Sequence, residues 1–190
     1  MTDRYHHGDL RRALIDAAVE AVGEAGPSAL SLRAVAKKAG VSHAAPAHHF
    51  GDKAGLLTAV AAEGFGRLAD TLEAAWDATG DFTAVGAAYV RFAIDRRPYF
   101  EVMFRPELVH ADDPDLQRAA SRSAAALHRG SGESDGGEFN AAALAAWSLA
   151  HGFAELLVAG NFPQAVKNDP EAAFRAVGRA TGLGSDHSSG

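Results

Sequence analysis

Histidine is the residue type whose positions first suggest chemistry in this chain. Nine histidines occur, and five of them, His6, His7, His43, His48 and His49, lie within the first 50 residues. Imidazole can ligate a metal ion, move a proton or hydrogen-bond a nucleic-acid base. No two of the nine are three or four residues apart, the spacing that places two metal ligands on one helix face. The sequence therefore predicts neither a metal site nor a cofactor.

A second candidate for chemistry is the pair His151 and Glu155. Four residues separate them, so on a helix the carboxylate can orient the imidazole as a general base. An all-helical enzyme or small-molecule carrier is one function that this pair allows. The chain has, however, no nucleophile motif, no glycine-rich phosphate loop and no cysteine, and the sequence predicts that the protein is not an enzyme.

Composition favours a helical protein. Alanine occurs 43 times, against 14 Val plus Ile and 6 Thr. Alanine loses no side-chain entropy in a helix, whereas β-branched residues do, so we expect an all-α fold. The absence of cysteine excludes disulfides and fits a reducing compartment. There is no N-terminal export signal and no run of about 18 uncharged apolar residues, and we therefore expect a cytoplasmic protein with no membrane partner.

Charge is distributed unevenly along the chain. The formal net charge is −6, which alone would argue against nucleic acid as a partner. Residues 1–57, however, carry 7 Lys plus Arg against 6 Asp plus Glu, whereas residues 58–190 carry 11 against 18. The acidity thus belongs to the C-terminal part, and the N-terminal part remains compatible with DNA.

Apolar periodicity and capping residues divide the chain into helices. The predicted N-caps are Asp9, Ser31, Ser42, Asp52 and Asp113. Residues 129–137 are predicted to form a mobile connection, and residues 184–190 a disordered tail. The predicted helices cover about 9–24, 32–39, 43–48, 53–76, 82–96, a short piece from 98, 114–128, 138–159 and 170–181.

Two short helices flank the turn Gly40-Val41-Ser42. This is the pattern of a helix-turn-helix, whose second helix has the right size to enter a DNA major groove about 12 Å wide. The residues themselves are more specific than this helix-turn-helix spacing. The stretch SLRAVAKKAGVSHAAPAHHFGDKAGLL, residues 31–57, resembles the DNA-binding domain of TetR-family transcriptional regulators, and the resemblance continues over roughly residues 5–65.

The resemblance implies a domain organisation and a set of DNA contacts. Residues 1–57 are expected to form a three-helix DNA-binding domain, and residues 58–183 a helical effector-binding and dimerisation domain. The base-reading positions are Ser42, His43, Ala44 and Ala45, and the phosphate-contacting positions are Ser31, His49 and Lys53. Arg33 and His48 are further candidates for DNA contact. Three alternatives stay open. Arg33, with Lys37 and Lys38, belongs to a merely solvated helix face; His49 is a structural histidine that bridges helices; and Lys53 is a surface residue of the first helical turn.

One position departs from the family pattern. The family usually has a tyrosine where this chain has Ala47, and alanine cannot make the backbone contact of that side chain. We therefore expect lower operator affinity than in a typical relative, or compensation by His48. A TetR-like protein that has lost sequence-specific binding is the alternative that this departure keeps open.

The C-terminal part carries a weaker resemblance. Trp147, His151 and Gly152 resemble the W…HG signature of one effector-domain type in the family. They either line a ligand cavity or form an ordinary packed cluster with a hydrogen-bonded histidine. The candidate cavity residues, which in most proteins would simply be core, are Phe65, Leu68, Leu72, Tyr89, Phe92, Met103, Phe104, Leu127, Trp147 and His151.

Together these features predict a ligand-responsive repressor. A homodimer, joined through the helices at about 138–159 and 170–181, would bind a palindromic double-stranded DNA operator. A small, mostly apolar effector would release it. Alanines in both helices, Ala141, Ala142, Ala145, Ala146, Ala172, Ala173 and Ala176, allow close contact between helices, although they equally suit a seam within one chain.

Overall fold

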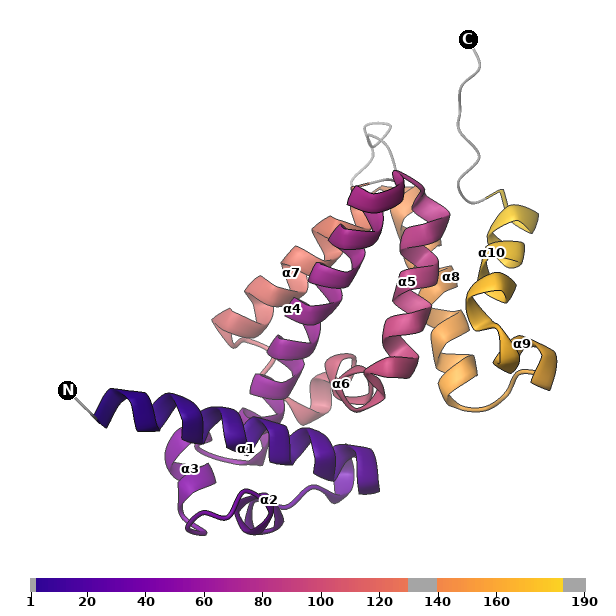
Figure 1. Cartoon of the computed structure of the whole chain (residues 1–190). Coiled ribbons are helices and arrows are strands. Elements are labelled where there is room, and N and C mark those ends of the chain that lie inside the picture. Colours follow the sequence, from indigo (N-terminus) through magenta and orange to yellow (C-terminus); the bar gives the residue numbers. More distant parts are fainter. Residues whose placement is uncertain (1–2, 130–139, 183–190) are drawn as a thin grey trace. The chain divides into compact units, whose positions relative to one another are not determined.

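The computed structural model of the chain describes residues 3–129 and 140–182, and these residues form helices without any strand. The predicted all-α fold is confirmed (Figure 1). The elements are α1 (Asp3–Ala25), η1 (Pro27–Ala29), α2 (Leu32–Lys38), α3 (Ala45–Phe50), α4 (Lys53–Thr79), α5 (Phe82–Asp95), α6 (Arg97–Met103), η2 (Pro106–Leu108), α7 (Pro114–His128), α8 (Ala141–Val158), α9 (Gln164–Asn168) and α10 (Pro170–Ala180).

Side-chain caps explain where several helices begin. Asp52 accepts from the backbone N–H of Gly55 at 2.8 Å, and Asp113 accepts from that of Leu116 at 2.9 Å, so both predicted caps are confirmed. Asn140 and Asp169 cap α8 and α10 in the same way. Local side-chain chemistry therefore sets the starts of α4, α7, α8 and α10.

Three predicted N-caps need correction. Helix α1 begins at Asp3, so Asp9 lies inside it instead of capping it. Ser31 occupies the N-cap position of α2, but its side chain makes no capping hydrogen bond. Helix α3 begins at Ala45 and not after Ser42, because Pro46 pre-sets the first-turn geometry and the carbonyl of Ser42 accepts from the N–H of Ala45 in a turn.

The predicted segments at 130–137 and 184–190 lie outside the described residues. The short elements η1, η2 and α9 were not predicted, since one helical turn leaves no periodic signal.

The chain divides into two compact units. The first falls within Met1–Phe65 and Arg96–Ala120, and the second within Gly66–Asp95 and Ser121–Gly190. In the first unit α1 packs against α2 and α6, and α2 against α3. Gly64 of α4 lets α6 approach closely, because a Cβ there would stand 2.7 Å from Sδ of Met103. The hydroxyl of Tyr99 then donates to Glu63 at 2.9 Å.

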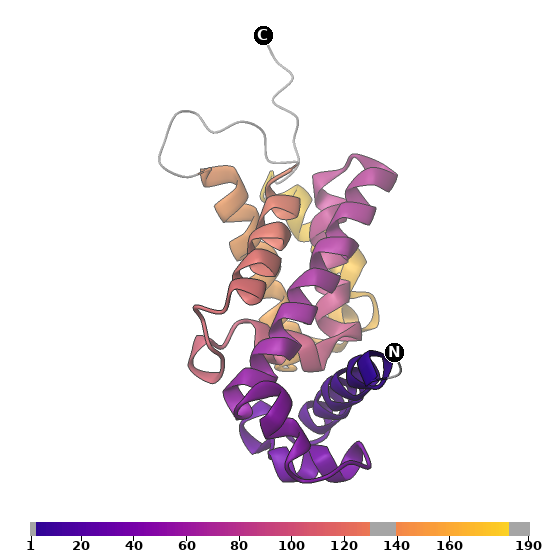
Figure 2. The same ribbon diagram turned by 90° about the vertical axis from the view of Figure 1, so that its left-hand side faces the viewer.

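The second unit is built on α5, which packs against both α8 and α10 (Figure 2). Its centre is the fully buried Phe174 of α10, which lies against Phe153 with ring centroids 5.5 Å apart. Phe174 fits because position 86 of α5 is glycine, where a Cβ would stand 2.5 Å from the aromatic ring. The absence of a side chain at Gly86 of α5 thus makes room for the Phe174 ring of α10.

Helix α8 is apolar on its outer side as well as its inner side. Leu144, Trp147 and Leu156 are 45%, 39% and 46% exposed. By length and composition α8 is the one described helix able to cross a membrane, with Glu155 its only Asp, Glu, Lys or Arg. A core helix passes the same test, so this property does not by itself indicate a membrane. It does leave an apolar surface uncovered on this unit.

Candidate nucleic-acid interface and effector site

Helices α2 and α3 form a helix-turn-helix around Gly40. This glycine has φ +68°, the left-handed conformation that ends α2, and the next N–H, that of Val41, donates to Ala36 at 3.0 Å. Val35, Ala36 and Pro46 are buried and hold the two helices to the unit. The opposite surface of the turn and of α3 exposes Ser42, His43, Ala44, Ala47 and His48, while Ala45 is half-buried.

The cations of α2 differ in their availability. Arg33 and Lys37 are exposed, and neither has an ion pair within the described part of the chain. Lys38 instead lies 3.0 Å from Glu20 and 2.8 Å from Glu24 of α1, and these carboxylates raise its pKa. Arg33 and Lys37 are therefore available to an external anion, whereas Lys38 joins α2 to α1.

Two predicted phosphate contacts are engaged within the unit. His49 is half-buried, and its ring lies between those of His48 and Phe50, with centroid distances of 5.6 and 6.2 Å. The ammonium of Lys53 donates to the carbonyl of Ser28 at 2.7 Å, which ties the start of α4 to η1. Ser31, the third, is exposed at the start of α2.

An unpredicted link joins the residues before α7 to α4. The backbone N–H of His110 donates to Thr58 at 2.8 Å, and its imidazole Nε2 lies 3.2 Å from Asp52. The N–H of Gly55 and the contact with His110 lower the pKa of Asp52. His110 and Asp52 are 58 residues apart in the chain, so no local sequence pattern could have paired them.

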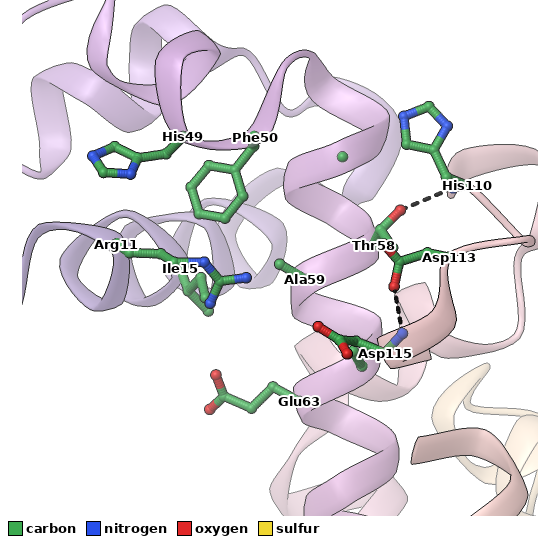
Figure 3. Close-up of a pocket in the computed structure, with 12 residues that line it drawn as sticks. Arg11, Ile15, His49, Phe50, Thr58, Ala59, Glu63, His110, Asp113 and Asp115 are labelled. Atoms are coloured by element: carbon green, nitrogen blue, oxygen red, sulfur yellow. Dashed lines mark hydrogen bonds between the residues drawn. The ribbon is translucent and has the colours of Figure 1, made fainter. Parts of the chain in front are cut away.

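A pocket of about 390 Å³ lies in the first unit over α4 (Figure 3). Its carboxylates are already used: Asp113 caps α7, Asp115 pairs with Arg118, and Glu63 binds Arg12 and Tyr99. None of the predicted effector residues lines it. This pocket is thus a polar groove whose carboxylates already have hydrogen-bond or ion-pair partners within the protein.

In the second unit, α5 and α8 bring three of the predicted effector residues together. The hydroxyl of Tyr89 lies 2.9 Å from Nδ1 of His151, and the Trp147 ring lies beside the imidazole at a centroid distance of 6.0 Å. Burial raises the pKa of Tyr89 and lowers that of His151, although Glu155, 3.8 Å away, opposes the shift of His151. Both shifts favour the neutral forms, so the neutral imidazole of His151 is oriented by the neutral phenol of Tyr89.

The remaining effector candidates are mostly core residues. Phe65 and Phe104 are half-buried and meet edge to face, with ring centroids 5.4 Å apart. The others are at most 5% exposed: Leu68, Leu72, Phe92, Met103 and Leu127. Burial of this kind fits a ligand cavity and a plain core equally, so their ligand role stays a prediction.

Comparison with known protein families gives two matches. Residues 14–60 match the family described as "Bacterial regulatory proteins, tetR family", and residues 82–180 match the "Tetracyclin repressor-like, C-terminal domain". The HTH-type transcriptional regulator BetI of Rhizobium meliloti (strain 1021) is 36% identical over 103 residues, which are 53% of this chain and 47% of that protein. The chain's match thus spans about half the length of that relative (47%).

Solved structures extend the likeness to nearly the whole chain. A protein with unknown function from Rhodococcus sp. RHA1 is 32% identical, with 92% of this chain and 97% of that chain covered and a TM-score of 0.66. The multidrug binding protein EbrR, solved with imidazole, is 25% identical, with 88% and 86% covered and a TM-score of 0.58. The matched families comprise transcription regulators, not enzymes, which removes the enzyme alternative for His151 and Glu155. Since residues 82–180 make up more than half of it, the chain belongs to the TetR family of bacterial transcriptional regulators.

Proposed function

We propose that this chain is a cytoplasmic, ligand-responsive repressor that binds a palindromic DNA operator as a homodimer. The observation that carries the proposal is the surface of the helix-turn-helix. Ser42, His43 and His48 point away from the core, and Arg33 and Lys37 flank them without intramolecular ion pairs among the described residues. The helix-turn-helix thus exposes polar groups that can contact base edges and cations that can contact phosphates.

The two family matches, at residues 14–60 and 82–180, support the proposed division of the chain into two functional parts. Residues 1–57 read DNA, and residues 58–183 bind the effector and dimerise. Exposed alanines on α8 and α10 support a four-helix interface between two copies: Ala141, Ala142, Ala145, Ala172 and Ala176. Ala146 is buried within its own chain and Ala173 is half-buried, so these two alanines serve the seam inside the protomer.

The effector is a small, mostly apolar molecule held near Tyr89, Trp147 and His151. The structural likeness to EbrR, a multidrug binding protein, supports such a ligand. Effector binding selects a dimer with altered spacing of its recognition helices, and operator and effector therefore weaken each other's binding by the same factor.

Selection of bound duplexes from random DNA tests the proposal. We expect an enriched, two-fold symmetric site, preferred over bulk DNA by about a thousandfold or more. Enrichment of no site, with binding governed only by salt, would instead support the alternative of a TetR-like protein without sequence preference. An enriched site without symmetry would contradict the homodimer.

Ala47→Tyr should tighten binding to the selected operator by about tenfold, because a phenol at this exposed position can donate to a phosphate in each half-site. Affinity is measured by titration at fixed salt. Ala25→Tyr adds the same side chain at an exposed position of α1 and should leave the affinity unchanged. Weaker binding by Ala47→Tyr would show that the operator backbone does not pass this position.

A further inference from the structure

We infer that His43 and His48 contact DNA in their protonated form, so that operator binding takes up protons and tightens as the pH falls. The inference rests on the proposed function. It adds the charge state of the two histidines on the DNA-facing surface of the helix-turn-helix. It gives this regulator a response to pH that a lysine- or tyrosine-based reader lacks.

The composition of the reading segment is the first observation. Residues 41–51, VSHAAPAHHFG, contain no Lys, Arg, Asp or Glu. Histidines are therefore the only groups of this segment that can become cationic. His43 and His48 are exposed, whereas His49 is half-buried beside Phe50. Two imidazoles per chain are thus free to meet a phosphate or the acceptor edge of a purine.

The cations of the surrounding elements do not replace them. In α2, Lys38 is held by two glutamates. At the start of α4, Lys53 donates to a backbone carbonyl. In α1, the guanidinium of Arg11 lies over the Phe50 ring, 5.2 Å from its centroid. Arg12 of α1 is bound by Asp16 and Glu63. Among the described side chains of α1, α2 and the start of α4, the cations that remain are Arg33 and Lys37, and both belong to α2 and not to the recognition helix.

The described carboxylates of α1 and of the start of α4 are also occupied. Glu20 and Glu24 of α1 bind Lys38, and Asp52 caps α4 and contacts His110. Among the described residues, neither His43 nor His48 has an ion pair with any of them. No internal counter-ion therefore neutralises an imidazolium on this face, and the DNA backbone is the anion available to it.

The size of the effect follows from linkage. A histidine imidazole changes charge between about pH 5 and 8. A polyanion favours the protonated form, and proton uptake on binding makes affinity rise as pH falls. If DNA prefers the charged form about threefold at each of four imidazoles in a dimer, affinity changes by about a hundredfold across this range.

The test uses the full-length chain and the duplex recovered by selection. Affinity is measured at fixed salt from about pH 8 to about pH 5, and calorimetry in buffers of different ionisation enthalpy counts the protons taken up. We expect about hundredfold tighter binding at the lower pH. We also expect a salt dependence that steepens by about 0.9 for each additional phosphate contact. Binding that is flat or weaker at low pH, with the helical signal intact, would overturn the inference.

Three variants separate charge from structure. The double variant His43→Gln, His48→Gln should lose the pH response, and His43→Lys, His48→Lys should bind tightly at both pH values. His110→Gln, which changes a histidine of the same unit that lies outside residues 41–51 and contacts Asp52, should keep the full response. An unchanged response in the double glutamine variant would assign the protons to other groups and overturn the inference. A chain that enriches no duplex at any pH would instead refute the proposed function itself.

Discussion

Gly86→Val should lower the free energy of unfolding by about 3 kcal/mol, a large fraction of the stability of a domain of this size. A Cβ at position 86 would stand 2.5 and 2.8 Å from two ring carbons of Phe174, closer than real Cβ contacts come. Phe174 is fully buried and lies against Phe153, so its ring has no free space to enter. The clash must separate α10 from α5.

Equilibrium unfolding in urea measures this loss. Gly66→Val is the matched control, because a Cβ at that position of α4 meets nothing within 4 Å. We expect the control to stay within about 0.5 kcal/mol of the native chain, since valine is no worse than glycine in a helix. Equal stabilities for the two variants would mean that α10 does not pack on α5 as described.

Gly152→Leu should weaken dimerisation by about a hundredfold or more while leaving the protomer folded. Gly152 lies near the middle of α8, and a Cβ there would meet no atom of its own chain within 4 Å. Glycine inside a helix is destabilising by about 1 kcal/mol relative to alanine, and no contact among the described residues explains a glycine at this position. In the proposed homodimer, close approach of the second copy to this apolar face would explain the glycine.

Sedimentation over a range of concentrations measures the dimer, and operator affinity should fall in parallel because a monomer reads only one half-site. Ala125→Leu adds a comparable side chain at an exposed position of α7 and should change neither property. A Gly152→Leu chain that dimerises normally would exclude this face from the interface. Dissociation by Ala176→Leu alone would then place the contact on α10.

Local signals in the sequence predicted much of the fold. The N-caps Asp52 and Asp113 act on N–H groups three residues away, and such chemistry can be read from a short window. Ser42 failed as a predicted cap because Pro46, four residues later, decides where α3 starts. Capping preferences compete within one turn, and the sequence alone does not rank them.

The candidate site was predictable only where it is local. The exposed surface of the helix-turn-helix follows from periodicity and from the glycine at position 40. The contact of His110 with Asp52, the hydrogen bond of Tyr99 to Glu63 and the one between Tyr89 and His151 join residues 36 to 62 positions apart. Such pairs depend on helix packing, which a single sequence does not specify.

The uncovered apolar face of α8 has a consequence for the lifetime of the protein. A protomer that keeps Leu144, Trp147 and Leu156 in water forgoes part of the hydrophobic stabilisation that the proposed homodimer would recover. By mass action, resistance to heat and to proteolysis then rises with protein concentration. A cell that dilutes this regulator would expose it to degradation as monomers, so that its abundance would fall more steeply than its rate of synthesis.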